Sequence, residues 1–217
     1  MFDERVSREP IDLLRDAVER TGVQTLERPA TGRTHDDADE SQGTFATDSA
    51  VGFDPFPLLE ALHRAGVRAV VIGQVAGILH GSVELTGDLD LLWDGASLHA
   101  NGLAAAFAAV GSSLTDDDGV PIVLKPEAFL RPKVQFASPQ VSGDCCTPAL
   151  AWGALPIRTF LSRALTVSGP GSFEVHYLSR EDLICMRRAA GRPKDLRRAD
   201  ELERIGRGDT PVPGVGR

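Results

Sequence analysis

Cysteine is scarce in this chain. Three cysteines occur among 217 residues, and two of them, Cys145 and Cys146, are adjacent. Adjacent cysteines rarely bridge each other and no C-x-x-C pair is present, so neither a disulfide framework nor a zinc site is expected. Such cysteine usage favours a reducing compartment.

Long apolar segments are also absent. No run approaches the roughly 20 residues that a helix needs to span a bilayer. The opening residues, MFDERVSREP, are acidic and lack the apolar stretch of a secretory signal. We therefore expect a cytoplasmic protein without membrane association. Its hydrophobic share of 42% is sufficient for a buried core.

The negative charge is concentrated near the N-terminus. The chain has a formal net charge of −8, and residues 1–50 hold 12 acidic and 6 basic residues. The rest is therefore close to neutral, and the overall charge does not indicate nucleic acid as a partner.

Composition divides the chain into three parts. Residues 1–52 form an acidic leader, with helical spacing over 9–20 and then a polar stretch, 27–50, that we expect to be disordered. Residues 53–205 contain the apolar patterning of a domain. Residues 206–217 are rich in glycine and proline and are predicted to be a flexible tail.

Within the domain, helical and strand patterns alternate. Ser97 is the expected N-cap of the helix predicted over 97–110. Their order predicts an α/β (α+β) fold, with a mixed sheet, flanking helices and two C-terminal helices. Helices are expected at 57–65, 74–80, 97–110, 180–190 and 194–205, and strands at 68–72, 88–93, 121–124, 133–137, 163–167 and 173–177, the last two as a hairpin.

The pattern with most chemical content is Asp88-Leu89-Asp90. Alternate residues of a strand share a face, so the two carboxylates should project together. They would repel each other unless a cation lay between them, and Mg²⁺ is the natural hard cation. Gly73, before a predicted helix, would let phosphates approach backbone N–H groups. A strand with one polar edge would explain Asp88 and Asp90 alone, but not their combination with Gly73.

These features resemble the nucleotidyltransferase superfamily that includes DNA polymerase β and the minimal nucleotidyltransferases. Gly73-Gln74 is followed by 13 residues and then by the Asp-x-Asp motif, and the closing stretch LSREDLICMRRAAGRPKDLRRADEL resembles the C-terminal helices of small bacterial members. The resemblance spans about residues 56–205.

The resemblance implies a nucleotidyltransferase-type fold and a chemistry. Asp88 and Asp90 would be catalytic and bind Mg²⁺, while Gly73 and Gln74 would frame the phosphates of a nucleoside triphosphate (NTP). A hydroxyl of a protein, RNA or small molecule would attack the α-phosphorus, as part of a toxin–antitoxin or defence system. Further nucleotide-binding roles are implied for Lys194, for Arg187 or Arg192 beside it, and for Asp195, which would orient Lys194.

Two positions depart from the family pattern. Gln74 replaces a Gly or Ser, and Gln135 lies where a third carboxylate is expected. Glu174 or Asp144 are the available substitutes. Because an amide cannot act as a base, a second hypothesis is a non-catalytic binding or partner module with the same fold. A third is an adaptor that acts through its acidic leader, which would fold on a basic partner.

Overall fold

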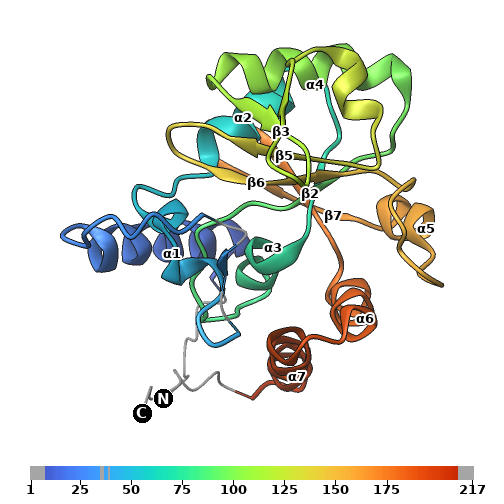
Figure 1. Cartoon of the computed structure of the whole chain (residues 1–217). Helices are drawn as coiled ribbons and strands as arrows, with labels where there is room; N and C mark the ends of the chain where they lie inside the picture. The colour runs from blue at the N-terminus through green and yellow to red at the C-terminus, as the bar shows by residue number, and fades with distance from the viewer. Residues whose placement is uncertain (1–7, 35–36, 39, 210–217) are drawn as a thin grey trace.

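The computed structural model describes residues 8–34, 37–38 and 40–209. These residues form one eight-stranded mixed sheet with seven α-helices (Figure 1), in agreement with the expected mixed α/β class. The strands are β1 (Val70–Val71), β2 (Leu91–Leu92), β3 (Ser113–Thr115), β4 (Pro121–Ile122), β5 (Lys133–Ala137), β6 (Ser142–Cys146), β7 (Leu165–Ser168) and β8 (Glu174–Tyr177).

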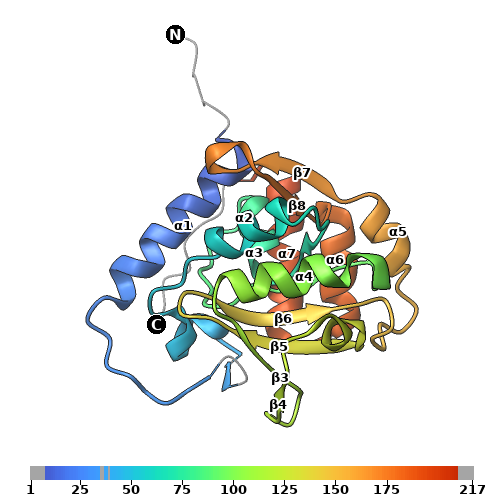
Figure 2. The same ribbon diagram turned by 90° about the horizontal axis from the view of Figure 1, so that it is seen from above.

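Helices cover both faces of this sheet. The α-helices are α1 (Pro10–Thr25), α2 (Phe56–Arg64), α3 (Gly73–Leu79), α4 (Ser97–Ala109), α5 (Ile157–Ser162), α6 (Arg180–Ala190) and α7 (Pro193–Gly206). Short 3-10 helices are η2 (Thr44–Ala46), η3 (Asp48–Ala50), η4 (Pro126–Leu130) and η5 (Pro170–Ser172). Figures 1 and 2 show α2 and α4 on one face, and α1, α3, α6 and α7 on the other.

The sheet order is β4-β3-β5-β6-β2-β1-β8-β7. The pairs β1–β8 and β2–β6 are parallel and the others are antiparallel. The central strands β1 and β2 are fully buried, which explains their continuous Val and Leu runs. Phe107 of α4 packs on Phe129 and Phe136, with both ring centroids 4.9 Å away.

Several expected elements are present, and some differ. The β7–β8 hairpin, β5 and α6 match the predictions. The strand expected over 88–93 is shorter, because only 91–92 form a ladder and Asp88 makes an isolated bridge to Ser142. Ser97 is the first residue of α4 rather than its cap, and the Asp94 carboxylate accepts from the Ala96 N–H at 2.8 Å.

Strands β3 and β6 and helix α5 were not predicted. Strand β6 contains glycine and aspartate, which disfavour strands in sequence patterns. It forms because β2 and β5 pair with it from both sides. Gly143 is required there, since a Cβ would lie 2.0 Å from the Leu89 carbonyl oxygen.

The described part of the leader is folded onto the domain, contrary to the expected disorder over 27–50 and the expected domain start at 53. Thr47 and Ala50 are completely buried, and Gly87 abuts Ala50 so closely that a Cβ would lie 2.5 Å from its nitrogen. The Arg28 guanidinium donates to the carbonyls of Phe45 and Thr47. Hydrogen bonds therefore hold a segment that has few apolar side chains.

Residues 1–7, 35–36, 39 and 210–217, including most of the predicted tail, lie outside the described residues.

Candidate functional site

Three carboxylates share one face of the sheet where β2 meets β6. Leu91 pairs with Cys145, and Asp88 forms its parallel bridge to Ser142 in the same register. That register sets Asp144 opposite Asp90, and partners on neighbouring strands project to the same side. Asp88 is two residues from Asp90, so it lies on this face too.

Asp90 is enclosed by charge and by backbone. A Cβ on Gly73 would lie 2.1 Å from Asp90 Oδ2, and Gly73 has φ +62°. Burial and the charges of Asp88 and Asp144 raise the pKa of Asp90 well above its ordinary value. A hydrogen bond from the Asp144 N–H and the Arg192 guanidinium act on this pKa in the opposite direction. Like charges so close together favour a bound cation.

Asp88 is held by two hydroxyl groups. Its Oδ1 accepts from Thr44 at 2.7 Å and from Thr86 at 2.5 Å, and the two hydroxyl oxygens are themselves 2.8 Å apart. Thr44 belongs to η2, so the leader supplies a direct contact to this carboxylate. Sequence patterns did not identify Thr44, because nothing local in the sequence relates it to a residue 44 positions away.

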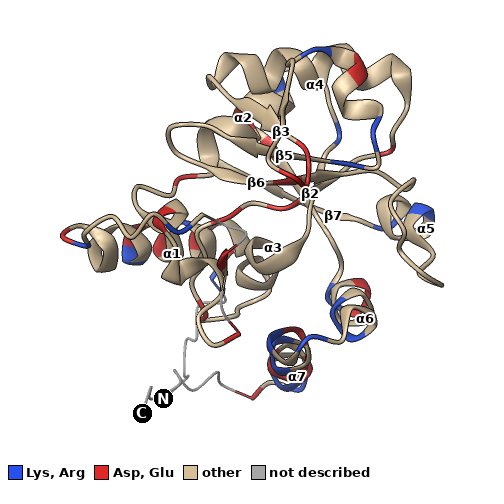
Figure 3. Cartoon of the chain, viewed as in Figure 1, with Lys and Arg blue, Asp and Glu red and all other residues tan. Residues whose placement is uncertain are grey.

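The carboxylates open into a pocket of about 590 Å³. Its size is that of a small-molecule or cofactor site. Acidic residues on its sheet wall face basic residues from α6, α7 and the turn between them; Figure 3 shows acidic positions on the sheet around β2, β5 and β6, and basic ones along α6 and α7. The charged lining residues are Glu40, Asp88, Asp90, Asp117, Lys133, Asp144, Arg187, Arg192, Lys194, Asp195 and Arg198.

Gln74 and Arg187 form a buried hydrogen-bond network. The Arg187 guanidinium donates to Gln74 Oε1 at 2.8 Å, to the Gly73 carbonyl at 3.0 Å and to the Arg198 carbonyl at 3.0 Å. Gln74 Nε2 donates to Ser82 Oγ and to a backbone carbonyl. Burial lowers the pKa of Arg187 to about 10, so it remains protonated at neutral pH. Both side chains line the pocket and join α3, α6 and α7. The phosphate contact expected of Gln74 is through its backbone N–H, which this side-chain network leaves unaffected.

The α7 residues are arranged differently from the expectation. Asp195 is buried and accepts a 2.5 Å hydrogen bond from Arg192 Nε, so it orients Arg192 and not Lys194. Lys194 is only 8% exposed and lines the pocket, and no described carboxylate lies within ion-pair distance of its Nζ. Its backbone N–H donates to the Glu40 carboxylate at 3.1 Å. Arg192 and Lys194 are thus the cationic groups best placed for an anion.

The structure distinguishes the two substitutes for a third carboxylate. Asp144 lies beside Asp90, whereas Glu174 is exposed on β8, which is separated from β2 by β1. Gln135 pairs with Asp144 across β5 and β6, so it borders the carboxylates. Lys133 Nζ lies 3.7 Å from Asp144 and 2.5 Å from Asp117. Among the described residues, no three His, Cys, Asp or Glu side chains already form a metal-holding group.

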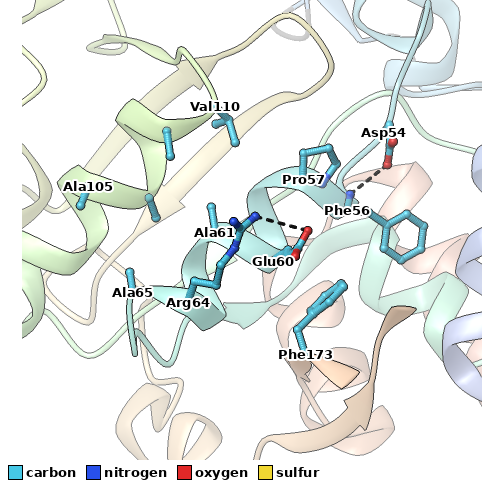
Figure 4. A pocket seen from close by; sticks show the side chains of 12 residues that line it. Asp54, Phe56, Pro57, Glu60, Ala61, Arg64, Ala65, Ala105, Val110 and Phe173 are labelled. Atoms are coloured by element: carbon cyan, nitrogen blue, oxygen red, sulfur yellow. Dashed lines mark hydrogen bonds and ion pairs between the residues drawn. The ribbon is translucent and has the colours of Figure 1, made fainter. Parts of the chain in front are cut away.

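A second pocket lies between α2 and α4 and has a different character (Figure 4). It has a volume of about 540 Å³ and is lined largely by alanines and other apolar side chains. Its Arg64 is paired with Glu60 on the same helix at 3.4 Å, and its Asp54 accepts from the Phe56 N–H. The charged side chains of this second pocket are thus paired within α2 or at its N-terminus. The pocket is therefore a weaker candidate for a ligand-binding site.

Comparisons with known proteins add no family assignment. The chain matches no protein-family model, no curated protein and no solved structure. Among the described residues, no helix combines the length and apolar character required to cross a bilayer.

Proposed function

We propose that this chain is a metal-dependent nucleotidyltransferase, with a nucleotidyltransferase-type fold, that moves a nucleotidyl group from an NTP to a hydroxyl acceptor. The observation that carries this proposal is the placement of Asp88, Asp90 and Asp144 on one face of neighbouring strands, across a pocket from Arg192 and Lys194. Carboxylates facing cations across one cavity suit a ligand that carries both a divalent cation and phosphates.

The donor set fits Mg²⁺. Carboxylate oxygens are its preferred protein ligands, and it typically uses one or two of them, with phosphate oxygens and waters completing its shell. This explains why a site without three converging side chains remains suitable. When bound, Mg²⁺ would supply charge neutralisation for the departing pyrophosphate. The raised pKa of Asp90 supports the same conclusion, because the carboxylates are electrostatically unfavourable by themselves.

The chain's own groups then have distinct roles. Asp88 and Asp90 hold the cation, with Asp88 fixed by Thr44 and Thr86. Asp144 accepts the proton of the acceptor hydroxyl as its oxygen bonds to the α-phosphorus and the bond to pyrophosphate breaks. Lys194 and Arg192 bind phosphate oxygens. We place this activity in the cytoplasm, which agrees with three cysteines that are all free of disulfides.

Label transfer tests this proposal. The protein is incubated with Mg²⁺ and each α-labelled NTP, alone and with RNA or cell lysate. Wild-type protein should transfer label, the variant with Asp88→Ala and Asp90→Ala should not, and Asp144→Asn should reduce transfer strongly. Glu174→Gln is the matched control, since this carboxylate is exposed on β8 and should be dispensable. Label transfer that is absent, or equal in the wild type and the double variant, would reject the proposal.

The non-catalytic alternative rested on Gln74 and Gln135. Gln74 has a structural role, because its amide is bonded on both sides by Arg187 and by Ser82. Asp144 provides the carboxylate that Gln135 lacks. We therefore favour a catalytic function over a non-catalytic binding module. Such a module would show little Mg²⁺-dependent affinity for NTP.

A further inference from the structure

The charged pocket has an apolar end that the proposed phosphate chemistry does not use. From the carboxylates it continues along β6 to Cys146 and then to Leu150 and Trp152 in the following loop. Leu183 and Met186 of α6 add further apolar lining to the pocket. Asp144 and Thr147 are three residues apart along extended chain, which is about 10 Å. Because the Trp152 indole is hydrogen-bonded to the Thr147 carbonyl, the ring lies on the order of 10 Å from Asp144, a distance that a nucleoside can bridge.

The Trp152 ring is fixed in orientation. Its Nε1 donates to the Thr147 carbonyl at 2.8 Å, and the backbone between them is folded by hydrogen bonds from the Leu150 N–H to Thr147 and from the Trp152 N–H to Leu150, at 3.1 and 2.8 Å. The indole N–H is thus already satisfied, and what remains for a ligand is the aromatic surface. Trp152 is half-buried, in contrast to Trp93, which is 1% exposed.

The thiol of Cys146, which lines the same pocket as Trp152, is uncharged. Burial and the neighbouring Asp144 raise the pKa of the Cys146 thiol, so it stays protonated and acts as a small apolar group, not a nucleophile.

Lys194 gives an independent indication that an anionic ligand enters this pocket. Its side chain is almost completely buried there, and no described carboxylate lies within ion-pair distance of it.

We propose that Trp152 stacks on the nucleobase of the bound NTP, with the triphosphate extending to the carboxylates. This inference rests on the proposed function and identifies the base-binding half of that site. Stacking on an aromatic ring tolerates every base, because each base has a π-face. The apolar end should therefore select nucleoside triphosphates over inorganic triphosphate, with little preference among the four bases.

Binding measurements on wild type and variants test the proposal. Dissociation constants for Mg²⁺·ATP, Mg²⁺·GTP and Mg²⁺·tripolyphosphate are measured by calorimetry. Trp152→Ala should weaken binding of both nucleotides about 10-fold or more, and leave tripolyphosphate unchanged. Trp152→Phe should retain most of the affinity. Leu155→Ala is the matched control, because Leu155 is an apolar residue of the same loop that does not line this pocket.

Fluorescence gives a second readout. Since Trp93 is buried, nucleotide should quench mainly Trp152 emission, and tripolyphosphate should not. If Trp152→Ala leaves nucleotide affinity unchanged while substitution of Asp88 and Asp90 abolishes it, the stacking proposal is wrong and the proposed function stands. Equal weakening for tripolyphosphate would also overturn stacking, because it would indicate a distorted loop. Absence of nucleotide binding to wild type would reject both proposals.

Discussion

The Thr44 hydroxyl donates a 2.7 Å hydrogen bond to Asp88 Oδ1, so a residue of the acidic leader directly positions a carboxylate of the candidate site. The same hydroxyl oxygen accepts from the Gly87 N–H at 3.2 Å. The leader is therefore not an independent tail in this region. It completes the wall of the pocket that holds Asp88.

Thr44→Val should reduce activity and stability together. It removes a hydrogen bond to a charged group and leaves a buried N–H without its acceptor, at a cost of about 1–3 kcal/mol in unfolding free energy. Thr25→Val is the control: Thr25 is also buried, but its hydroxyl lies 2.8 Å from the Thr21 carbonyl and 3.4 Å from the Ala50 carbonyl, and it contacts no carboxylate of the site. Urea unfolding and label transfer should show comparable stability losses, with activity lost only for Thr44→Val. Equal activity in both variants would argue against a positioning role.

Gly73→Ala should disrupt the site by direct collision with Asp90. The added Cβ would lie 2.1 Å from Oδ2, and φ of +62° is unfavourable for alanine. Gly66 has φ +66° and open space around it, so Gly66→Ala carries only the backbone strain. Unfolding free energies should therefore fall further for Gly73→Ala, and only that variant should lose Mg²⁺·NTP binding. A similar loss in both would mean that Asp90 moves away freely.

Arg187→Met should destabilise the fold by about 3 kcal/mol or more. It leaves the buried Gln74 Oε1 without this donor and removes two hydrogen bonds that link α6 to the Gly73 and Arg198 carbonyls. Arg188→Met is the neighbouring control, because Arg188 is exposed and forms surface ion pairs with Asp200 and Glu203. Thermal unfolding should distinguish the two variants clearly. Similar melting temperatures would contradict a structural role for the Arg187 network.

The pH dependence of stability should report on Asp90. Its folded pKa lies above its unfolded value near 3.8, so the folded state holds the proton more strongly. Without metal, folding stability should therefore fall as pH rises from 3.8 through the raised pKa of folded Asp90. Asp90→Asn removes this penalty, so in EDTA the unfolding free energy of the variant should increase relative to that of the wild type as pH rises above 3.8. Urea midpoints of both proteins, measured at increasing pH, report this difference in stability. A difference that does not change with pH would indicate that the pKa of Asp90 is not shifted.

Much of the fold was predictable because its elements have strong local patterns. The Val and Leu runs of β1 and β2 and the β7–β8 hairpin follow directly from hydrophobic patterning and turn residues. The proximity of Asp88 and Asp90 followed from strand periodicity.

What could not be predicted depends on tertiary contacts. Strand β6 has a weak local pattern, so the position of Asp144 beside Asp90 emerges only from its pairing with β2. Residues 40–50 have few apolar side chains and are held largely by hydrogen bonds to distant parts of the chain. Lys194 and Asp195 were identified as a pair, yet Asp195 contacts Arg192 because helix geometry turns it toward that neighbour.

The most direct test of the central claim is calorimetric titration of NTP in Mg²⁺ and in EDTA. The wild type and Glu174→Gln should bind NTP only when Mg²⁺ is present. The variant with Asp88→Asn and Asp90→Asn should lose this metal-dependent binding while unfolding cooperatively. Binding that is equally tight in EDTA, or that survives in the double variant, would contradict a site in which these carboxylates hold a metal-bound nucleotide.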